Sequence, residues 1–249
     1  MTIHYHGTPI TPRRVLLTQL AGRHFCVSYY SPDDVRTCHE IGQSVMLDNG
    51  AFSAWKLEAK TDWPGYHAWC DEWFAYPTTW AVIPDVIVGT DEDNDRLINE
   101  WPHGERGAPV WHMHESIDRL KRLVDEWPRV CFGSSKEYAE LLTPHWCRRM
   151  DEAWNAIAKR HLPYVHMLRG MQIVRSEWPF ASVDSTDIAR NHNRPQNTAK
   201  SMAERWDARQ CQARWEPVSV QQTMFPSVPK HPWLQYTAER MAKLAEQAP

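Results

Sequence analysis

The sequence predicts a single (β/α)8 barrel of the TIM type followed by a C-terminal extension, on three observations. Short apolar runs alternate with helical segments eight times between residues 3 and 215, which is the number of units in such a barrel. No G-x-G-x-x-G turn follows an apolar run, so the competing open, doubly wound sheet lacks its signature. No break in composition precedes Glu216, so we place the barrel at residues 1–215 and the extension at residues 216–249.

Eight apolar runs bounded by polar or turn-forming residues are the expected strands. In chain order they are Ile3–His6, Phe25–Tyr29, Val45–Asp48, Trp80–Asp85, Val110–His114, Val130–Gly133, Tyr164–Leu168 and Phe180–Asp184. Because alternate residues of a barrel strand face inward, His4 and His6 are expected to share the interior with His112 and His114.

Helix starts are marked by capping residues, in most cases followed by proline. Thr11-Pro12 is expected to open Arg13–Ala21, Ser31-Pro32-Asp33 to open Asp34–Ile41, Ser116 to open a helix with leucines at positions 120 and 123, and Thr143-Pro144 to open His145–His161. After the barrel, Pro217–Pro232 is expected to be a surface loop and Pro232–Gln247 a short helix.

Composition limits the classes of function. The formal charge of −3 provides no general cationic field for a polyanion, so any nucleic-acid binding needs a local patch. No apolar stretch is long enough for a membrane span and the N-terminus does not resemble a signal peptide, so we expect a cytoplasmic protein that does not bind membranes. The six scattered cysteines, without a C-x-x-C pair, are expected to be free thiols.

Chemically capable side chains gather where the expected strands end, which is the edge at which α/β barrels build active sites. Asp48 and Asp184 directly follow apolar strand cores. The other strand ends contribute Asp85, His112, His114 and Arg169. Two carboxylates, imidazoles and an arginine at one mouth form a credible catalytic constellation.

The segment Leu47-Asp48-Asn49-Gly50-Ala51-Phe52-Ser53 resembles the D-S-G-G-[YF]-Q signature of the tRNA-guanine transglycosylases. Relatives in that superfamily include phage and bacterial enzymes that place 7-deazaguanine bases into DNA. Three later segments are similar to the family's motifs and follow in the same order: Pro84-Asp85-Val86, Phe132-Gly133-Ser134-Ser135 and Ser182-Val183-Asp184-Ser185. The resemblance spans roughly residues 44 to 194.

This resemblance implies a base exchange that needs no cofactor, in which guanine in a nucleic acid is replaced by a 7-deazaguanine base. It implies that Asp184 attacks the sugar C1′ and that Asp48 serves as acid and base. Phe52 is expected to stack on the base and Asp85 to hydrogen-bond its Watson–Crick edge. The other expected substrate-binding residues are Asn49, Gly50, His112, His114, Gly133, Ser134 and Arg169.

Two departures from the family bear on the substrate. The tRNA-acting members carry a C-x-C-x-x-C…H zinc site, which this sequence lacks, and His112 or His114 stands where the family has glutamine. DNA is therefore favoured over tRNA. Residues 186–215 carry six basic and three acidic side chains, so the nucleic-acid backbone is expected to contact Arg190, Arg194, Lys200, Arg205 and Arg209, with Arg214 in the same patch.

Other interpretations stay open. His4, His6, His112 and His114 with an aspartate would resemble the metal site of a barrel hydrolase, and a barrel that only binds a nucleobase or nucleic acid is the third class. Asp48-Asn49-Gly50 is also good turn chemistry, Asp184 can be a helix cap, and the arginine-rich stretch can be a solvated face. A homodimer is possible.

Overall fold

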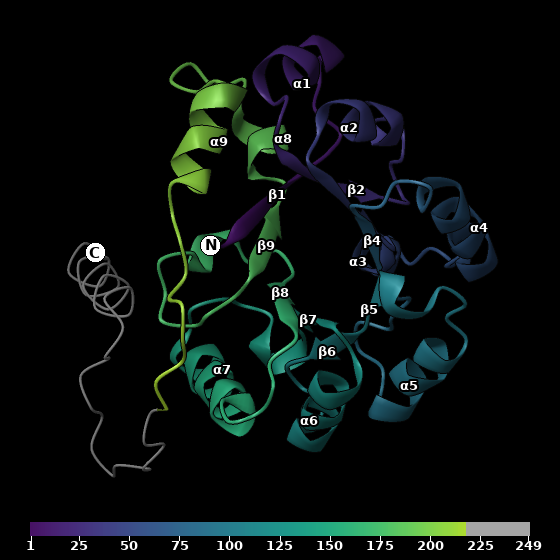
Figure 1. Ribbon diagram of the computed structural model, residues 1–249, viewed down its shortest axis with the longest axis vertical. Coiled ribbons are helices and arrows are strands. Elements are labelled where there is room, and N and C mark those ends of the chain that lie inside the picture. Colours follow the sequence, from purple (N-terminus) through teal and green to yellow (C-terminus); the bar gives the residue numbers. More distant parts are fainter. Residues whose placement is uncertain (218–249) are drawn as a thin grey trace, which may run out of the picture.

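Parallel strands ringed by helices form a barrel in the computed structural model, which describes residues 1–217 (Figure 1). The strands are β1 (Ile3–Gly7), β2 (His24–Ser28), β3 (Ser44–Asp48), β4 (Thr79–Val82), β5 (Gly107–Ala108), β6 (Val110–His112), β7 (Arg129–Gly133), β8 (Tyr164–Met167) and β9 (Ser182–Ser185). Their order in the sheet is β5-β4-β3-β2-β1-β9-β8-β7-β6, and every neighbouring pair is parallel.

The two ends of this sheet, β5 and β6, are successive pieces of one stretch of chain interrupted at Pro109. β5 pairs with β4, whereas β6 pairs with β7. Proline has no N–H to donate, but the carbonyl of Pro109 accepts a hydrogen bond from the N–H of Cys131 (2.9 Å). The nine strands therefore occupy eight positions around the barrel, and the predicted fold class is confirmed.

The helices are α1 (Arg13–Gln19), α2 (Val35–Ile41), α3 (Ala51–Lys56), α4 (Trp63–Trp73), α5 (Asp91–Asn99), α6 (Ile117–Glu126), α7 (Pro144–Ile157), α8 (Asp187–Asn191) and α9 (Ala199–Asp207). The predicted caps of α6 and α7 are confirmed, because Ser116 and Thr143 accept hydrogen bonds from the third backbone N–H of their helices. The predicted caps of α1 and α2 are wrong. Neither helix has a side-chain cap, and the carboxylate at the start of α2, Asp34, instead accepts the N–H of Ile10.

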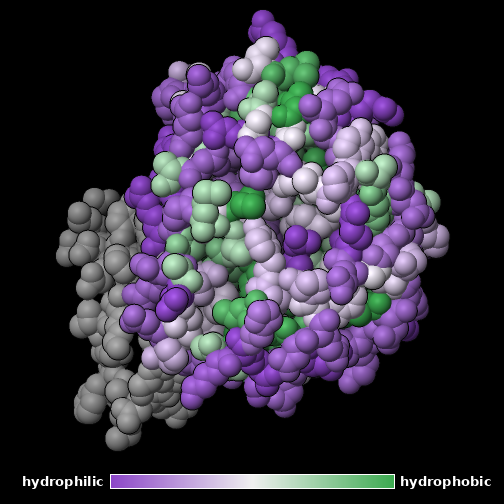
Figure 2. All heavy atoms as spheres, in the orientation of Figure 1, coloured by the Kyte–Doolittle hydropathy of each residue, from purple (hydrophilic) through white to green (hydrophobic). Residues whose placement is uncertain are grey.

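The barrel interior is a packed core and not a channel. Inward-facing side chains from seven strands form one apolar cluster: Tyr5, Cys26, Met46, Trp80, Val82, Ala108, Val110 and Cys131. The Trp80 indole donates to the Tyr5 hydroxyl (2.9 Å), and the Arg129 guanidinium lies 4.5 Å from the centre of the Trp80 ring. All six cysteines are free thiols, as expected. On the face seen in Figure 2, hydrophilic side chains dominate the periphery and apolar ones gather nearer the centre.

His4 and His6 do not share this interior, which corrects the prediction from the sequence. Tyr5 faces inward, and neighbouring side chains of a strand alternate, so both histidines face the outer side of β1. There His6 Nε2 lies 3.2 Å and His4 Nδ1 3.7 Å from Asp207 Oδ1, at the end of α9, and Arg23 also pairs with Asp207. The four-histidine metal site is therefore not formed.

Asp207→Ala is expected to lower the free energy of unfolding by about 1–3 kcal/mol, because it leaves the buried His6 and the partly buried Arg23 without their acceptor. Burial opposes ionisation of Asp207, but the hydrogen bond and charges of His6 and Arg23 lower its pKa. This contribution is present above the unfolded-state pKa of Asp207 and is lost progressively as pH falls through the lower folded-state pKa. Urea unfolding of the wild type and the variant at pH 7 and at about pH 2 measures the contribution. Glu204→Ala, on the exposed side of α9, serves as the control and should change little.

Two further sequence predictions concern the chain outside the barrel. Apart from Pro217, the expected loop Pro217–Pro232 and the expected helix Pro232–Gln247 lie outside the described residues. Within residues 1–217, no helix is long and apolar enough to cross a membrane.

Candidate active site

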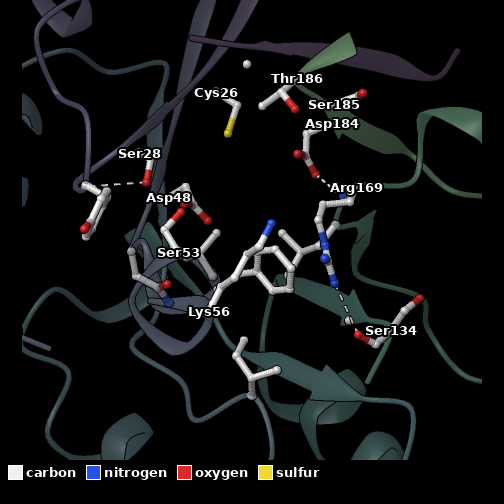
Figure 3. Close-up of a pocket in the computed structure, with 18 of the residues that line it drawn as sticks. Cys26, Ser28, Asp48, Ser53, Lys56, Ser134, Arg169, Asp184, Ser185 and Thr186 are labelled. Atoms are coloured by element: carbon white, nitrogen blue, oxygen red, sulfur yellow. Dashed lines mark hydrogen bonds between the residues drawn. The ribbon is translucent and has the colours of Figure 1, made fainter. Parts of the chain in front are cut away.

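A pocket of about 530 Å³ opens at the carboxyl ends of the strands. Figure 3 shows residues that line it, with Asp48 and Asp184 entering from different strands and Arg169 beside Asp184. The predicted site residues that line the pocket are Asp48, Asn49, Phe52, Asp85, His112, Gly133, Ser134, Arg169, Asp184 and Arg190. Ten residues predicted from strand ends, from the family resemblance and from the basic stretch thus lie around one cavity.

Asp184, on β9, is held by two donors. Its Oδ1 accepts the backbone N–H of Arg169 (2.6 Å) and lies 3.3 Å from His166 Nε2. His166 Nδ1 lies 2.7 Å from the Ser182 hydroxyl. Because a carboxylate only accepts, we assign the imidazole proton to Nε2 and the acceptor role to Nδ1. Burial lowers the pKa of His166 although Asp184 opposes this, so a neutral imidazole orients the Asp184 side chain.

The chain at Arg169 adopts a conformation that is uncommon for a residue with a side chain. Its φ is 55°, in the left-handed region that favours glycine. In this conformation the backbone N–H reaches Asp184, while the guanidinium carbon lies 3.8 Å from the centre of the Phe52 ring. Arg169 thus contacts both the Asp184 carboxylate and the Phe52 ring. Residues with such unusual backbone conformations tend to occur at active sites and ligand-binding sites.

Asp48, at the end of β3, is in a different electrostatic setting. Burial, together with the negative charges of Asp184 and Asp85, raises its pKa to about 6, although hydrogen bonds from Ser28 and the Gly50 N–H oppose the shift. A carboxyl group with that pKa can donate or accept a proton near neutral pH. Asp48 and Asp184 are therefore differentiated by their surroundings, as acid/base and nucleophile roles require.

The turn after Asp48 combines structural and site roles. Gly50 has φ 75°, and the Asn49 side-chain oxygen accepts the Ala51 N–H (2.8 Å), so the turn chemistry predicted for Asp48-Asn49-Gly50 is present. Asn49 Nδ2 also donates to Asp85 Oδ1 (2.7 Å). Gly50 does not line the pocket, but its N–H donates to Asp48 (3.1 Å).

Asp85 is fixed between two neighbours. Asn49 holds one carboxylate oxygen, and His112 Nε2 lies 2.8 Å from the other. Among residues 1–217, the buried His112 Nδ1 has no hydrogen-bond partner. The Glu115 carboxylate accepts the His112 N–H (2.8 Å) and pairs with Arg119. This buried Glu115–Arg119 pair is not predictable from the sequence, because nothing in the local pattern marks a glutamate that folds back onto a strand.

The structure places His112, and not His114, at the pocket. β6 ends at His112, and the chain then turns. His114 Nδ1 lies 2.6 Å from the Ser135 hydroxyl and Nε2 2.9 Å from the Gly89 carbonyl oxygen, so both ring nitrogens are engaged with the loops.

The expected basic surface does not form as one patch at the mouth. Arg190 lines the pocket, but Arg194, Lys200, Arg205 and Arg209 do not. After α8 the chain runs along the outside of the barrel towards its other end, where Gln210 contacts Thr2, just before β1. Ser28, Lys56 and Gln172 line the pocket and were not predicted. Ser28 is a strand-end residue that the same rule would have found, whereas Lys56 lies beyond a turn of helix.

Neither the models of known protein families nor the curated proteins match this sequence. The resemblance to the transglycosylases therefore rests on the sequence motifs quoted above.

Proposed function

We propose that the protein is a transglycosylase that exchanges guanine in a nucleic acid, preferentially DNA, for a 7-deazaguanine base. The observation that carries the proposal is that Asp48 and Asp184 share one pocket and interact electrostatically while being held differently. Asp184 is oriented by His166 and the Arg169 backbone, whereas Asp48 has a pKa of about 6. This division suits a reaction with one nucleophile and one proton carrier.

In the first half of the reaction, a carboxylate oxygen of Asp184 bonds to C1′ while the bond from C1′ to the base nitrogen breaks. The electron pair stays with the departing base, which takes a proton from Asp48. In the second half, Asp48 removes a proton from the incoming base, whose nitrogen displaces Asp184 from C1′. The oxocarbenium-like transition states of both halves gain from the neighbouring negative charge.

The remaining pocket residues supply recognition. Asp85, fixed by Asn49 and His112, presents acceptor oxygens to the donors of a guanine-like edge. Phe52 and the Arg169 guanidinium are flat groups that can stack on a base. Reaching a base inside a polymer requires turning its nucleotide out of the stack.

The proposal is tested by incubating the protein with a labelled 7-deazaguanine base and, in parallel, duplex DNA, single-stranded DNA and bulk tRNA. Label is expected to enter DNA. Label in tRNA alone would retain the exchange and overturn the DNA preference. Label in no polymer, with binding of the free base intact, would favour the binding barrel over the enzyme.

Gly133→Ala is expected to weaken base exchange without unfolding the protein. A methyl group on Gly133 would lie 3.0 Å from His112 Nδ1 and 3.2 Å from Val110 Cγ1, so the imidazole must move and its contact with Asp85 is disturbed. Since small misplacements at an active site cost up to about 100-fold, we expect kcat/KM to fall roughly 10- to 100-fold. Thermal unfolding of the variant is the control, and unchanged kinetics would show that His112 does not position Asp85.

A further inference from the structure

Exposed apolar side chains are concentrated beside the pocket. Among residues 1–217, six of the ten large exposed hydrophobic residues follow the carboxyl ends of β2, β3 and β4: Tyr30, Phe52, Trp55, Leu57, Val86 and Val88. Scattered exposed hydrophobics are ordinary, but a cluster at the mouth of a functional pocket marks a contact surface. Trp55 and Leu57, 50% and 59% exposed, lie at the end of the short helix α3 and just after it.

Helix α3 carries two of these aromatic rings outward from the pocket. Its buried face, Ala51 and Ala54, packs onto the barrel. Phe52 and Trp55 are three residues apart on its other side, and their ring centres are 5.8 Å apart with an angle of 40°. Since Phe52 lines the pocket under Arg169, the rings form a continuous track from the pocket to the surface.

Two cations line the pocket into which this track leads. Lys56 and Arg190 line the pocket from α3 and α8, and within the described part of the chain no hydrogen bond or ion pair engages the side chain of either. Figure 3 shows Lys56 pointing across the mouth, towards the space between Asp48 and Arg169. In a chain with a formal charge of −3, unpaired cations beside exposed aromatic rings are the combination that binds a single nucleic-acid strand.

We propose that α3 is the platform on which the substrate strand lies: Trp55 stacks on the base adjacent to the exchanged nucleotide, and Lys56 contacts the phosphate between them. The inference rests on the proposed function and narrows its substrate to a polymer strand with the target nucleotide turned out. A free nucleoside offers neither the second base nor the bridging phosphate. The pocket is lined by three carboxylates, which repel a polyanion. Stacking of bases on the aromatic track provides an attraction that holds the strand in place.

The first test measures binding. A short single-stranded DNA carries one guanine with 2-aminopurine beside it, because stacking of 2-aminopurine on an aromatic ring quenches its fluorescence. Using Asp184→Ala as the background, we expect quenching that Trp55→Ala abolishes, together with a roughly 5- to 100-fold weaker affinity. Trp55→Phe should retain most of the quenching and most of the affinity. Tyr76→Ala removes an exposed ring from the loop between α4 and β4, at the other end of the barrel, and should leave both unchanged.

A second variant tests the phosphate contact. Lys56→Gln should weaken binding of the oligonucleotide. The slope of log affinity against log salt concentration should become shallower by about one, because one phosphate contact is lost. In the exchange reaction, Trp55→Ala should raise KM for DNA while KM for the free base and kcat stay unchanged.

The outcomes separate this inference from the proposed function. If the wild-type protein exchanges bases and Trp55→Ala binds and quenches like its parent, the platform is overturned and the function stands. If quenching depends on Trp55 but no exchange occurs with any polymer, the platform stands and the function falls. Absence of oligonucleotide binding by the parent protein overturns the platform.

Discussion

Asp184→Asn is expected to lower the rate of base exchange on the order of 1000-fold or more. The amide keeps the size of the side chain and an acceptor oxygen for the Arg169 N–H, so the pocket should keep its shape. It removes the negative charge and the nucleophilic oxygen that must bond to C1′. Losing the covalent nucleophile of an enzyme typically costs several orders of magnitude in kcat.

The matched control is Asp125→Asn on α6, where an exposed carboxylate pairs with Arg160. It should leave kcat unchanged. Oligonucleotide binding by Asp184→Asn should survive, which separates a catalytic barrel from one that only binds. Exchange at more than a tenth of the wild-type rate would show that Asp184 is not the nucleophile.

The pH dependence of the two half-reactions should run in opposite directions around pH 6. Burial and the charges of Asp184 and Asp85 raise the pKa of Asp48 to about 6. Release of guanine needs protonated Asp48, so its rate should fall as pH rises through 6. Capture of the incoming base needs ionised Asp48, so its rate should rise over the same range. Single-turnover measurements of each half-reaction test this, and parallel profiles would contradict the role of Asp48.

Asp48→Asn should abolish exchange and yet stabilise the protein at pH 8. Below about pH 3 the carboxyl is mostly protonated in both the folded and the unfolded states, so the substitution should change little there. Above pH 6 it is ionised in both, and because the folded-state pKa is raised from 3.8 to about 6, the fold is penalised on the order of 2–3 kcal/mol. The variant lacks this penalty. Denaturant unfolding of the wild type and the variant at about pH 3 and at pH 8 measures the change in the free energy of unfolding. An equal change at the two pH values would contradict the raised pKa.

The barrel and the carboxylates at the centre of the pocket could be predicted from the sequence because both follow from one local rule. A run of apolar residues ending in a polar one marks a strand end, and parallel strands place all such ends at one face. Asp48, Asp85, His112 and Asp184 were found in this way. The rule carries no information about side chains reached by a further turn of helix, so Lys56 and the platform of α3 were not anticipated.

The errors have equally local causes. In the stretch His4-Tyr5-His6 both residue types occur inside and outside barrels, so the direction of alternation could not be decided, and a shift of one residue exchanges the two faces. The sequence predicts one basic surface after Asp184 because the basic residues there are close in sequence, but the structure separates them. The direction in which α9 runs along the barrel is set by tertiary contacts such as Asp207 with His6, which no local pattern records.

The most direct measurement of the central claim is the detection of the covalent intermediate. The protein would be mixed with guanine-containing single-stranded DNA without an incoming base, quenched with acid, and digested for mass spectrometry. The account predicts an ester between the DNA sugar and the peptide that contains Asp184, absent from Asp184→Asn. Exchange that proceeds without any adduct, or an adduct on a different residue, would contradict it.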